Sequence, residues 1–273
     1  MEPAPAKRRG RPPSASSEPS GEVQSLDRAM SILEVLAAAD GLTLSELARR
    51  TELPSSTAHR LLTTLHRRRL VGHDLESGLW TIGVGLFRVG SAYVRIRKLP
   101  EIGRPVIRAL VQAVDETVNL SMLDGPDLVC VAQSESHAPV RAFIRIGRRQ
   151  PIHASAAGKA ILARLTPERC AERLDALTLE RLTEHTHRTK RALAADVAEV
   201  AARGFGIDDE EQTLGMRCVA AAVLDEWGEP VGAISISAPT VRMPPERLGV
   251  LGERVRAAAE ELTALYCGRE SEG

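Results

Sequence analysis

The chain has 273 residues, 43% of them hydrophobic, which is enough to build the cores of two globular domains. It carries 36 Lys and Arg residues against 36 Asp and Glu residues, and this balance argues against a uniformly basic protein that coats nucleic acid. Two Trp, two Tyr and three Phe residues are too few to favour the binding of single strands by base stacking.

The cysteines and the apolar segments argue against further classes of protein. The four cysteines lie far apart and form no Cys-x-x-Cys pair, so no zinc or redox motif is predicted. There is no secretory signal and no run of 18 apolar residues, which predicts a cytoplasmic protein that does not enter a membrane.

Charge is divided unevenly along the chain. Residues 1–98 contain 15 Lys and Arg against 10 Asp and Glu, whereas the remainder contains 21 against 26. A basic front and an acidic back are typical of a DNA-binding domain joined to a domain with another task. Residues 1–21 are rich in Pro, Ser and Ala and are expected to form a disordered basic arm. Residues 7–13 of this arm fit a minor-groove hook and a plain basic tail equally well.

Residues 25–39 and 44–51 have the apolar period of two helices. The segment 53–65 follows them, with Pro54 suited to the first turn of a third helix and leucines at helical spacing on one face. Its polar N-terminal end is typical of a recognition helix that enters the major groove of DNA. The residues expected to contact DNA there are Ser55, Ser56, Thr57, His59 and Arg60.

The segments 70–75 and 79–82 flank Glu76-Ser77-Gly78, which indicates a β-hairpin. A hairpin behind a helix-turn-helix is a wing, so the ordered set predicts a winged helix-turn-helix domain at 22–84. Arg67 and Arg68 are expected to grip the DNA backbone beside the wing. A linker helix is expected next, at 85–99.

The remaining residues, 100–273, are predicted to form an α+β domain in which helices enclose a mostly antiparallel sheet. Strands are expected at 117–123, 128–133, 140–146, 218–224 and 231–237. Helices are expected at 101–115, 153–165, 191–203 and 245–266.

Both halves of the chain contain motifs that occur together in one known family: Val23-Gln24-Ser25-Leu26-Asp27-Arg28, Leu53-Pro54-Ser55-Ser56-Thr57, Glu116-Thr117-Val118-Asn119-Leu120, His153-Ala154-Ser155-Ala156-Ala157-Gly158, Asp209-Glu210-Glu211 and Ile234-Ser235-Ile236-Ser237. By these motifs the chain resembles the IclR family of bacterial transcriptional regulators, and most closely its glyoxylate-responsive branch. The resemblance covers about residues 22–267. It implies a winged helix-turn-helix, a linker helix and a C-terminal GAF-like effector-binding domain. It also implies homodimers that pair through the DNA-binding half and homotetramers that assemble through the effector domains.

The resemblance implies a regulator that binds a double-stranded DNA operator of a small-carboxylate operon and responds to glyoxylate or another 2-oxo acid. It assigns the effector to the backbone of Ala156 and Ala157 and to the side chains of Asp208 and Cys218. From spacing alone, the small residues at 155–158 fit a tightly packed helix start better than an anion site. The positions that match the family's apolar pocket wall are Pro139, Ala142, Gln150 and Met216, and the polar Gln150 departs from the pattern.

Other chemistry finds less support in the sequence. His185 and His187 could bind a metal ion, but no Cys or carboxylate stands at ligand spacing, so a solvated loop is expected. Cys218 with a histidine could form a nucleophile and base, yet no oxyanion motif accompanies it. We therefore expect no enzyme activity, no metal and no cofactor. The alternative is an enzyme or a non-regulatory binding protein for a small 2-oxo acid.

Overall fold

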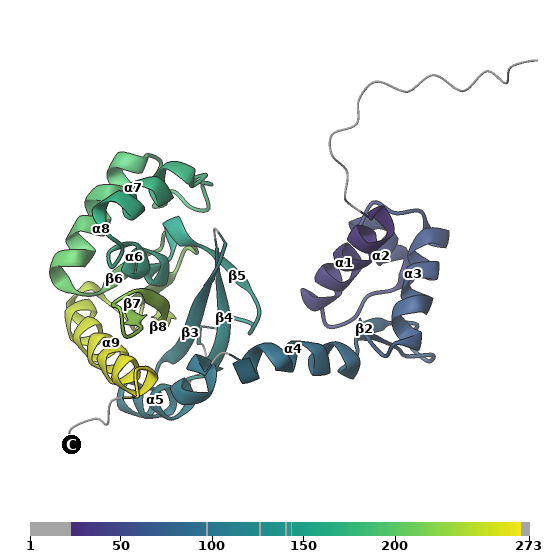
Figure 1. Ribbon diagram of the computed structural model, residues 1–273, viewed down its shortest axis with the longest axis horizontal. Coiled ribbons are helices and arrows are strands. Elements are labelled where there is room, and N and C mark those ends of the chain that lie inside the picture. Colours follow the sequence, from purple (N-terminus) through teal and green to yellow (C-terminus); the bar gives the residue numbers. More distant parts are fainter. Residues whose placement is uncertain (1–22, 97, 126, 140, 143, 269–273) are drawn as a thin grey trace, which may run out of the picture. The chain divides into compact units, whose positions relative to one another are not determined.

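The computed structural model describes residues 23–96, 98–125, 127–139, 141–142 and 144–268. Its internal contacts separate the chain into two units that meet between Ala92 and Tyr93 (Figure 1). This boundary falls within α4 (Val84–Ile96). The predicted basic arm at 1–21 lies outside the described residues. Among the helices of the described part, none is both long and apolar enough to cross a lipid bilayer.

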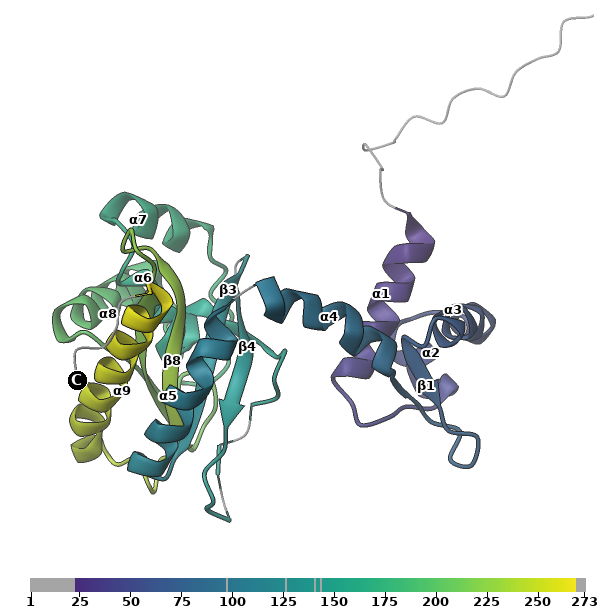
Figure 2. The same cartoon turned by 60° about the horizontal axis from the view of Figure 1, so that its bottom comes forward.

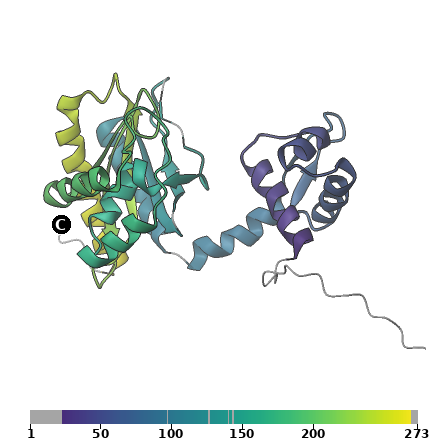
Figure 3. The same cartoon turned by 90° about the horizontal axis from the view of Figure 1, so that it is seen from above.

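Ahead of α4, the described part of the first unit consists of three helices and a hairpin, as the sequence predicts (Figure 3). Thr43 starts the second helix with a capping box, in which its hydroxyl accepts the Glu46 N–H and the Glu46 carboxylate accepts the Thr43 N–H. The apolar faces of all three helices share one core with Trp80 of the hairpin. The elements are α1 (Gln24–Ala37), α2 (Leu44–Arg50), α3 (Ser55–Arg67), β1 (Val71–His73) and β2 (Trp80–Ile82).

Two glycines allow the start of α4 to lie directly against the turn between α3 and β1. The Gly85 N–H donates to the Arg69 carbonyl at 2.8 Å, and the Gly83 N–H donates to the Leu70 carbonyl at 2.9 Å. A Cβ atom on either glycine would stand 2.5 Å from the Arg69 carbonyl oxygen. Because only a residue without a side chain permits this approach, α4 begins fixed to the end of α3.

The second unit is built on one antiparallel sheet of six strands in the order β5-β4-β3-β8-β7-β6. Its register places Asp208 of β6 opposite Cys218 of β7, and Cys218 opposite Ser237 of β8. The strands are β3 (Thr117–Asp124), β4 (Asp127–Ser134), β5 (Arg149–Pro151), β6 (Gly206–Asp209), β7 (Met216–Leu224) and β8 (Pro230–Pro239).

Helices cover both faces of this sheet, because alternate side chains of a strand point to opposite faces. Two helices, α5 and α9, lie side by side over one face (Figure 2), in a core that includes Val219 and Ala221 of β7. Helices α6 and α8 pack on the other face, in a core that includes Ala220 and Ala222. The bounds are α5 (Leu99–Val114), α6 (Ala156–Leu162), α7 (Pro167–Ala176), α8 (Lys190–Arg203) and α9 (Pro245–Tyr266).

The α+β fold is as predicted, but some elements differ. The strand predicted at 140–146 was wrong, since none of the described residues in that range is in a strand. The neighbouring strand is β5 (Arg149–Pro151), which forms because its backbone pairs with β4. The helix predicted at 153–165 begins later, because a 3-10 turn (Ile152–Ala154) precedes the N-cap residue Ser155. Neither β6 nor α7 was predicted from the sequence.

Candidate functional site

The polar end of α3 lies on the surface of the first unit. Ser55, Ser56, His59 and Arg60 are exposed, and Thr57 is half-buried. No side chain caps the N-terminus of α3, so its first N–H groups are open to an acceptor outside the helix. Free amides beside short hydroxyls suit DNA phosphates and base edges. The opposite, buried face of α3 consists of Ala58, Leu62 and Leu65.

Positively charged side chains also lie at the C-terminal end of α3. Arg67 is the last residue of α3, Arg68 is its C-cap, and both are exposed. Within the described part of the chain, neither these two residues nor Arg60 has an ion-pair partner. Unpaired guanidinium groups of this kind provide the electrostatic attraction by which proteins bind the DNA backbone. The first unit therefore presents the surface that a DNA-reading domain requires.

In the second unit, α6 begins in a closely packed position. Ala156 and Ala157 are its first residues and are buried. The hydroxyl of the N-cap residue Ser155 accepts the Gly158 N–H at 3.1 Å. A Cβ atom on Gly206 would collide with the Ala156 carbonyl, so the start of α6 lies directly against the start of β6. This packing brings Ala156 and Ala157 to the strand that carries Asp208.

Asp208 and Cys218 are cross-strand neighbours with perturbed protonation. Burial, together with the charge of Glu211, raises the pKa of the Asp208 carboxyl to about 7. Its Oδ1 accepts the Glu211 N–H at 2.8 Å and the Gln212 N–H at 3.3 Å. Burial, with the nearby charge of Asp208, raises the pKa of the Cys218 thiol to about 12. Cys218 is therefore a neutral thiol at neutral pH, which makes it a poor nucleophile.

A hydrogen-bonded row of polar side chains extends from Cys218 across the sheet. The Cys218 thiol donates to the Ser237 hydroxyl at 3.1 Å, and the Asn119 amide donates to the same hydroxyl at 3.2 Å. The Gln133 amide then donates to the Asn119 carbonyl oxygen at 2.8 Å. Sequence reasoning missed this row, although Asn119 and Ser237 both lie in motifs that match the family. The row gives the site polar groups on four adjacent strands.

The predicted pocket-wall residues are only partly brought together. Met216 is on β7, two positions before Cys218, and Ala142 accepts the Thr117 hydroxyl at 2.9 Å through its carbonyl. Gln150, however, lies on β5, and the strand order places β5 and β6 at opposite edges of the sheet. Pro139 is exposed. The polar Gln150 is thus not placed beside Asp208 by the sheet.

A group of buried and half-buried charged side chains lies beside this site, and we call it the Lys159 cluster: Lys159, His187, Asp196 and Glu211. Lys159 is fully buried, and its ammonium donates to Asp196 Oδ2 at 2.6 Å and to Glu211 Oε1. His187 Nε2 lies 3.0 Å from Asp196 Oδ2 and 3.7 Å from Glu211 Oε2. The two histidines lie in a loop as predicted, and His185 is exposed, but His187 is half-buried because carboxylates distant in sequence contact it.

The Lys159 cluster contains the ligand types of a metal site, with one imidazole and two carboxylates close together. The ammonium of Lys159 already bonds to both carboxylates, so we assign the cluster as an ion-pair network. Sequence spacing gives no signal for it, because its members come from α6, α8 and two loops.

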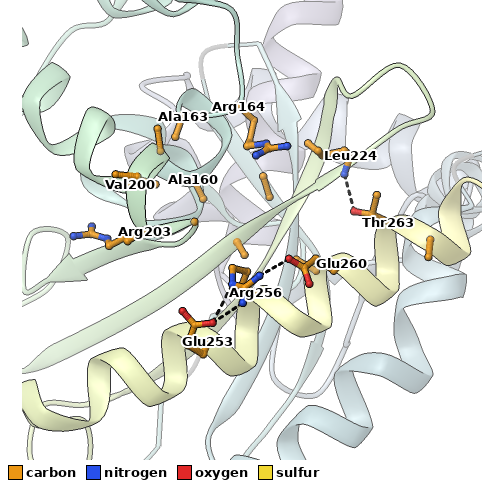
Figure 4. Close-up of a pocket in the computed structure, with 17 residues that line it drawn as sticks. Ala160, Ala163, Arg164, Val200, Arg203, Leu224, Glu253, Arg256, Glu260 and Thr263 are labelled. Carbon is orange, nitrogen blue, oxygen red and sulfur yellow. Dashed lines mark hydrogen bonds and ion pairs between the residues drawn. The ribbon is translucent and has the colours of Figure 1, made fainter. Parts of the chain in front are cut away.

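A separate groove of about 580 Å³ opens along the outer edge of β7, between α9 and the helices α6 and α8 (Figure 4). Alanines make up much of its lining, and Arg256 bridges Glu253 and Glu260 on its α9 side. The Leu224 N–H at its end donates to the Thr263 hydroxyl at 3.1 Å. None of the four predicted effector residues lines this groove, so it is distinct from the Asp208 site.

Comparison with known proteins agrees with both halves of the chain. Residues 25–75 match the family model described as the IclR helix-turn-helix domain, and residues 91–264 match that of the bacterial transcriptional regulator IclR C-terminal domain. The chain is 40% identical to the HTH-type transcriptional regulator BhcR of Paracoccus denitrificans, over 97% of this chain and 95% of the relative. It is 41% identical to the acetate operon repressor of Salmonella typhimurium, over 97% and 98%.

Among solved structures, a putative transcriptional regulator from Rhodococcus is 31% identical and superposes with a TM-score of 0.77, covering 90% of this chain and 98% of its own. These relatives are transcriptional regulators and not enzymes, which agrees with the neutral thiol of Cys218. Two family models and full-length relatives at about 40% identity establish that the chain belongs to the IclR family of bacterial transcriptional regulators.

Proposed function

We propose that this regulator controls a small-carboxylate operon and that glyoxylate or another 2-oxo acid is its effector. The observation that carries the proposal is the pairing of Asp208 with Cys218, where a buried acceptor and a neutral thiol lie beside the start of α6. The name of the acetate operon repressor supports a link to small carboxylates.

The chemistry of the site suits a hydrated 2-oxo acid. Hydrated glyoxylate carries two hydroxyl donors, and an ionised Asp208 is an acceptor for them. The effector carboxylate is expected to meet the backbone N–H groups of Ala156 and Ala157, and not the like-charged Asp208. Cys218 and the Ser237 hydroxyl bonded to it supply neutral polar contacts that an anion tolerates.

Calorimetric titration with glyoxylate, pyruvate, glycolate and 4-hydroxybenzoate tests the effector class. We expect a 2-oxo acid to bind most tightly and D208A to lose the effector response while still binding DNA. A normal ligand-induced shift of the operator complex in D208A would contradict the proposed site.

On the DNA side, we propose that residues 22–84 bind the operator, that 85–99 form the linker, and that 100–273 bind the effector. Ser55, Ser56, Thr57, His59 and Arg60 are expected to approach base edges and phosphates, with Arg67 and Arg68 on the backbone. The free N-terminal amides of α3 and its unpaired arginines support this assignment.

We further propose that the protein forms homodimers through the DNA-binding half and homotetramers through the effector domains. Val84, Phe87 and Val89 of α4 support the first contact, because these large apolar side chains are 65%, 74% and 66% exposed. Light scattering on the purified protein should give the mass of four chains. A mass of one chain at micromolar concentration would contradict the proposal.

A further inference from the structure

The Lys159 cluster lacks one positive charge when His187 is neutral. Two carboxylates, the half-buried Asp196 and the buried Glu211, then face one ammonium, and Arg203 lies 3.4 Å from Asp196 Oδ1. Among the described residues, Glu211 Oε2 is buried without a hydrogen-bond partner. A buried carboxylate oxygen without a hydrogen-bond partner destabilises the folded protein, because it has lost its contacts with water. His187 Nε2, 3.7 Å away, is the titratable group placed to offset this charge.

The surroundings of His187 favour its protonated form. A hydrogen bond with Asp196 and the charges of Glu211 and Asp196 raise its pKa above the ordinary 6.5, against burial and the charge of Lys159. These groups face the imidazole from α8, from the loop after β6 and from α6. His187 therefore carries a proton at neutral pH more often than a free imidazole does.

The segment that carries His187 is fastened to the loop that holds Asp208. The Thr183 hydroxyl donates to the Glu210 carbonyl at 2.7 Å, and the Thr186 hydroxyl donates to the Glu211 carbonyl at 2.7 Å. In turn, the Glu211 N–H donates to Asp208 Oδ1. The charge of Glu211 opposes ionisation of Asp208, and the charge of Lys159 favours it. Whatever neutralises Glu211 thus acts on the effector site.

We propose that His187 is a positioning residue for the effector site: when protonated, it offsets the charge of Glu211 and keeps Asp208 available as an ionised acceptor. The inference rests on the proposed function of Asp208. As pH falls through neutrality, Asp208 takes up a proton and effector affinity declines. His187 takes up its proton in the same pH range, and its positive charge offsets that of Glu211. Asp208 therefore stays ionised, and the effector stays bound, to a lower pH.

The test compares the dissociation constant of glyoxylate in wild type, H187Q and H185Q from pH 5.5 to 8.5, measured by calorimetry on the full chain. Glutamine retains a hydrogen bond to Asp196 but cannot take up a proton. We expect H187Q to bind as wild type at pH 8.5 and roughly threefold or more weakly at pH 6.5, which corresponds to half a pKa unit at Asp208. H185Q is the matched control, because His185 is exposed and, among the described residues, its side chain pairs only with Glu184, at 3.9 Å.

Each outcome bears on the proposal. The proposal would be overturned if the dissociation constant of H187Q followed that of wild type at every pH. It would also be overturned if the constant were raised by the same factor at every pH, because a uniform change reports only altered packing. E211Q provides a second variant: adding H187Q to it should have no further effect, and a persisting pH-dependent effect would overturn the route through Glu211. If D208N binds glyoxylate normally, the proposed function itself fails, and the role of His187 fails with it.

Discussion

Replacing Asp208 by Asn should stabilise the effector-free protein. Asp208 is only 4% exposed, and burial, reinforced by the charge of Glu211, raises its pKa to about 7 from the ordinary 3.8. Its Oδ1 accepts the Glu211 and Gln212 N–H groups, and an asparagine amide oxygen accepts them equally well. The substitution therefore removes the ionisable group and retains its hydrogen bonds.

The magnitude follows from proton linkage. Because the pKa of Asp208 is raised on folding, the folded state holds the proton more tightly than the unfolded chain. Below pH 3.8 Asp208 is protonated in both the folded and the unfolded state, so it does not lower the free energy of unfolding. Between pH 3.8 and 7 only the unfolded chain ionises, so the free energy of unfolding falls by about 1.4 kcal/mol per pH unit. Above pH 7 the decrease in the free energy of unfolding is complete, at about 4 kcal/mol. D208N has no ionisable group at this position and should not show this decrease.

Urea unfolding followed by far-ultraviolet circular dichroism at pH 5, 6, 7 and 8 measures this difference. D209N is the matched control, because Asp209 is the next residue, is exposed and forms an ion pair with Arg217. Its replacement should change the free energy of unfolding by less than about 1 kcal/mol, without a trend between pH 5 and 8. A D208N protein no more stable than wild type at pH 8 would refute the reasoning.

Other predictions concern DNA binding, packing and thiol chemistry. R60A should weaken operator binding by about 1–3 kcal/mol in a mobility-shift assay and leave effector affinity intact; unchanged binding would remove Arg60 from the contact surface. G206A should destabilise the protein by roughly 2 kcal/mol or more, because its Cβ would collide with the Ala156 carbonyl. G249A, where a Cβ meets open space in α9, should be neutral or stabilising by up to about 1 kcal/mol, and equal melting temperatures would contradict the packing of α6 on β6. Cys218, with a pKa of about 12, should resist iodoacetamide at pH 7.5 in the native protein because little thiolate is present; rapid labelling seen by mass spectrometry would show that the thiol pKa is not raised.

The long helices could be predicted from the sequence, but the edge strands could not. In α3 and α9, apolar residues recur at helical spacing and tertiary packing agrees with the local signal. At the sheet edges, tertiary packing and the local sequence signal disagree. The apolar segment 140–146 has a strand-like composition, whereas β5 (Arg149–Pro151) is short and polar and contains a proline. It becomes a strand because β4 offers it a backbone partner, and β6 is added to β7 in the same way.

The candidate effector residues came from the family resemblance, and the structure adds how they are arranged. Asp208 and Cys218 are ten positions apart, a separation without a local signal, and only the register of β6 with β7 makes them neighbours. The Lys159 cluster could not be predicted at all. Lys159 follows a glycine in a small-residue helix start, and nothing local indicates that its ammonium is buried between Asp196 and Glu211.

The contact of Gly83 and Gly85 with the Arg69 carbonyl has a mechanical consequence. Because no side chain separates the two backbones, the turn at the C-terminal end of α3 and the first turn of α4 pack directly against each other and are joined by hydrogen bonds. We therefore expect a rotation of the first turn of α4 to be passed on to the C-terminal end of α3. A larger side chain at Gly85 should therefore push the two backbones apart and weaken the coupling between rotation of α4 and the orientation of α3.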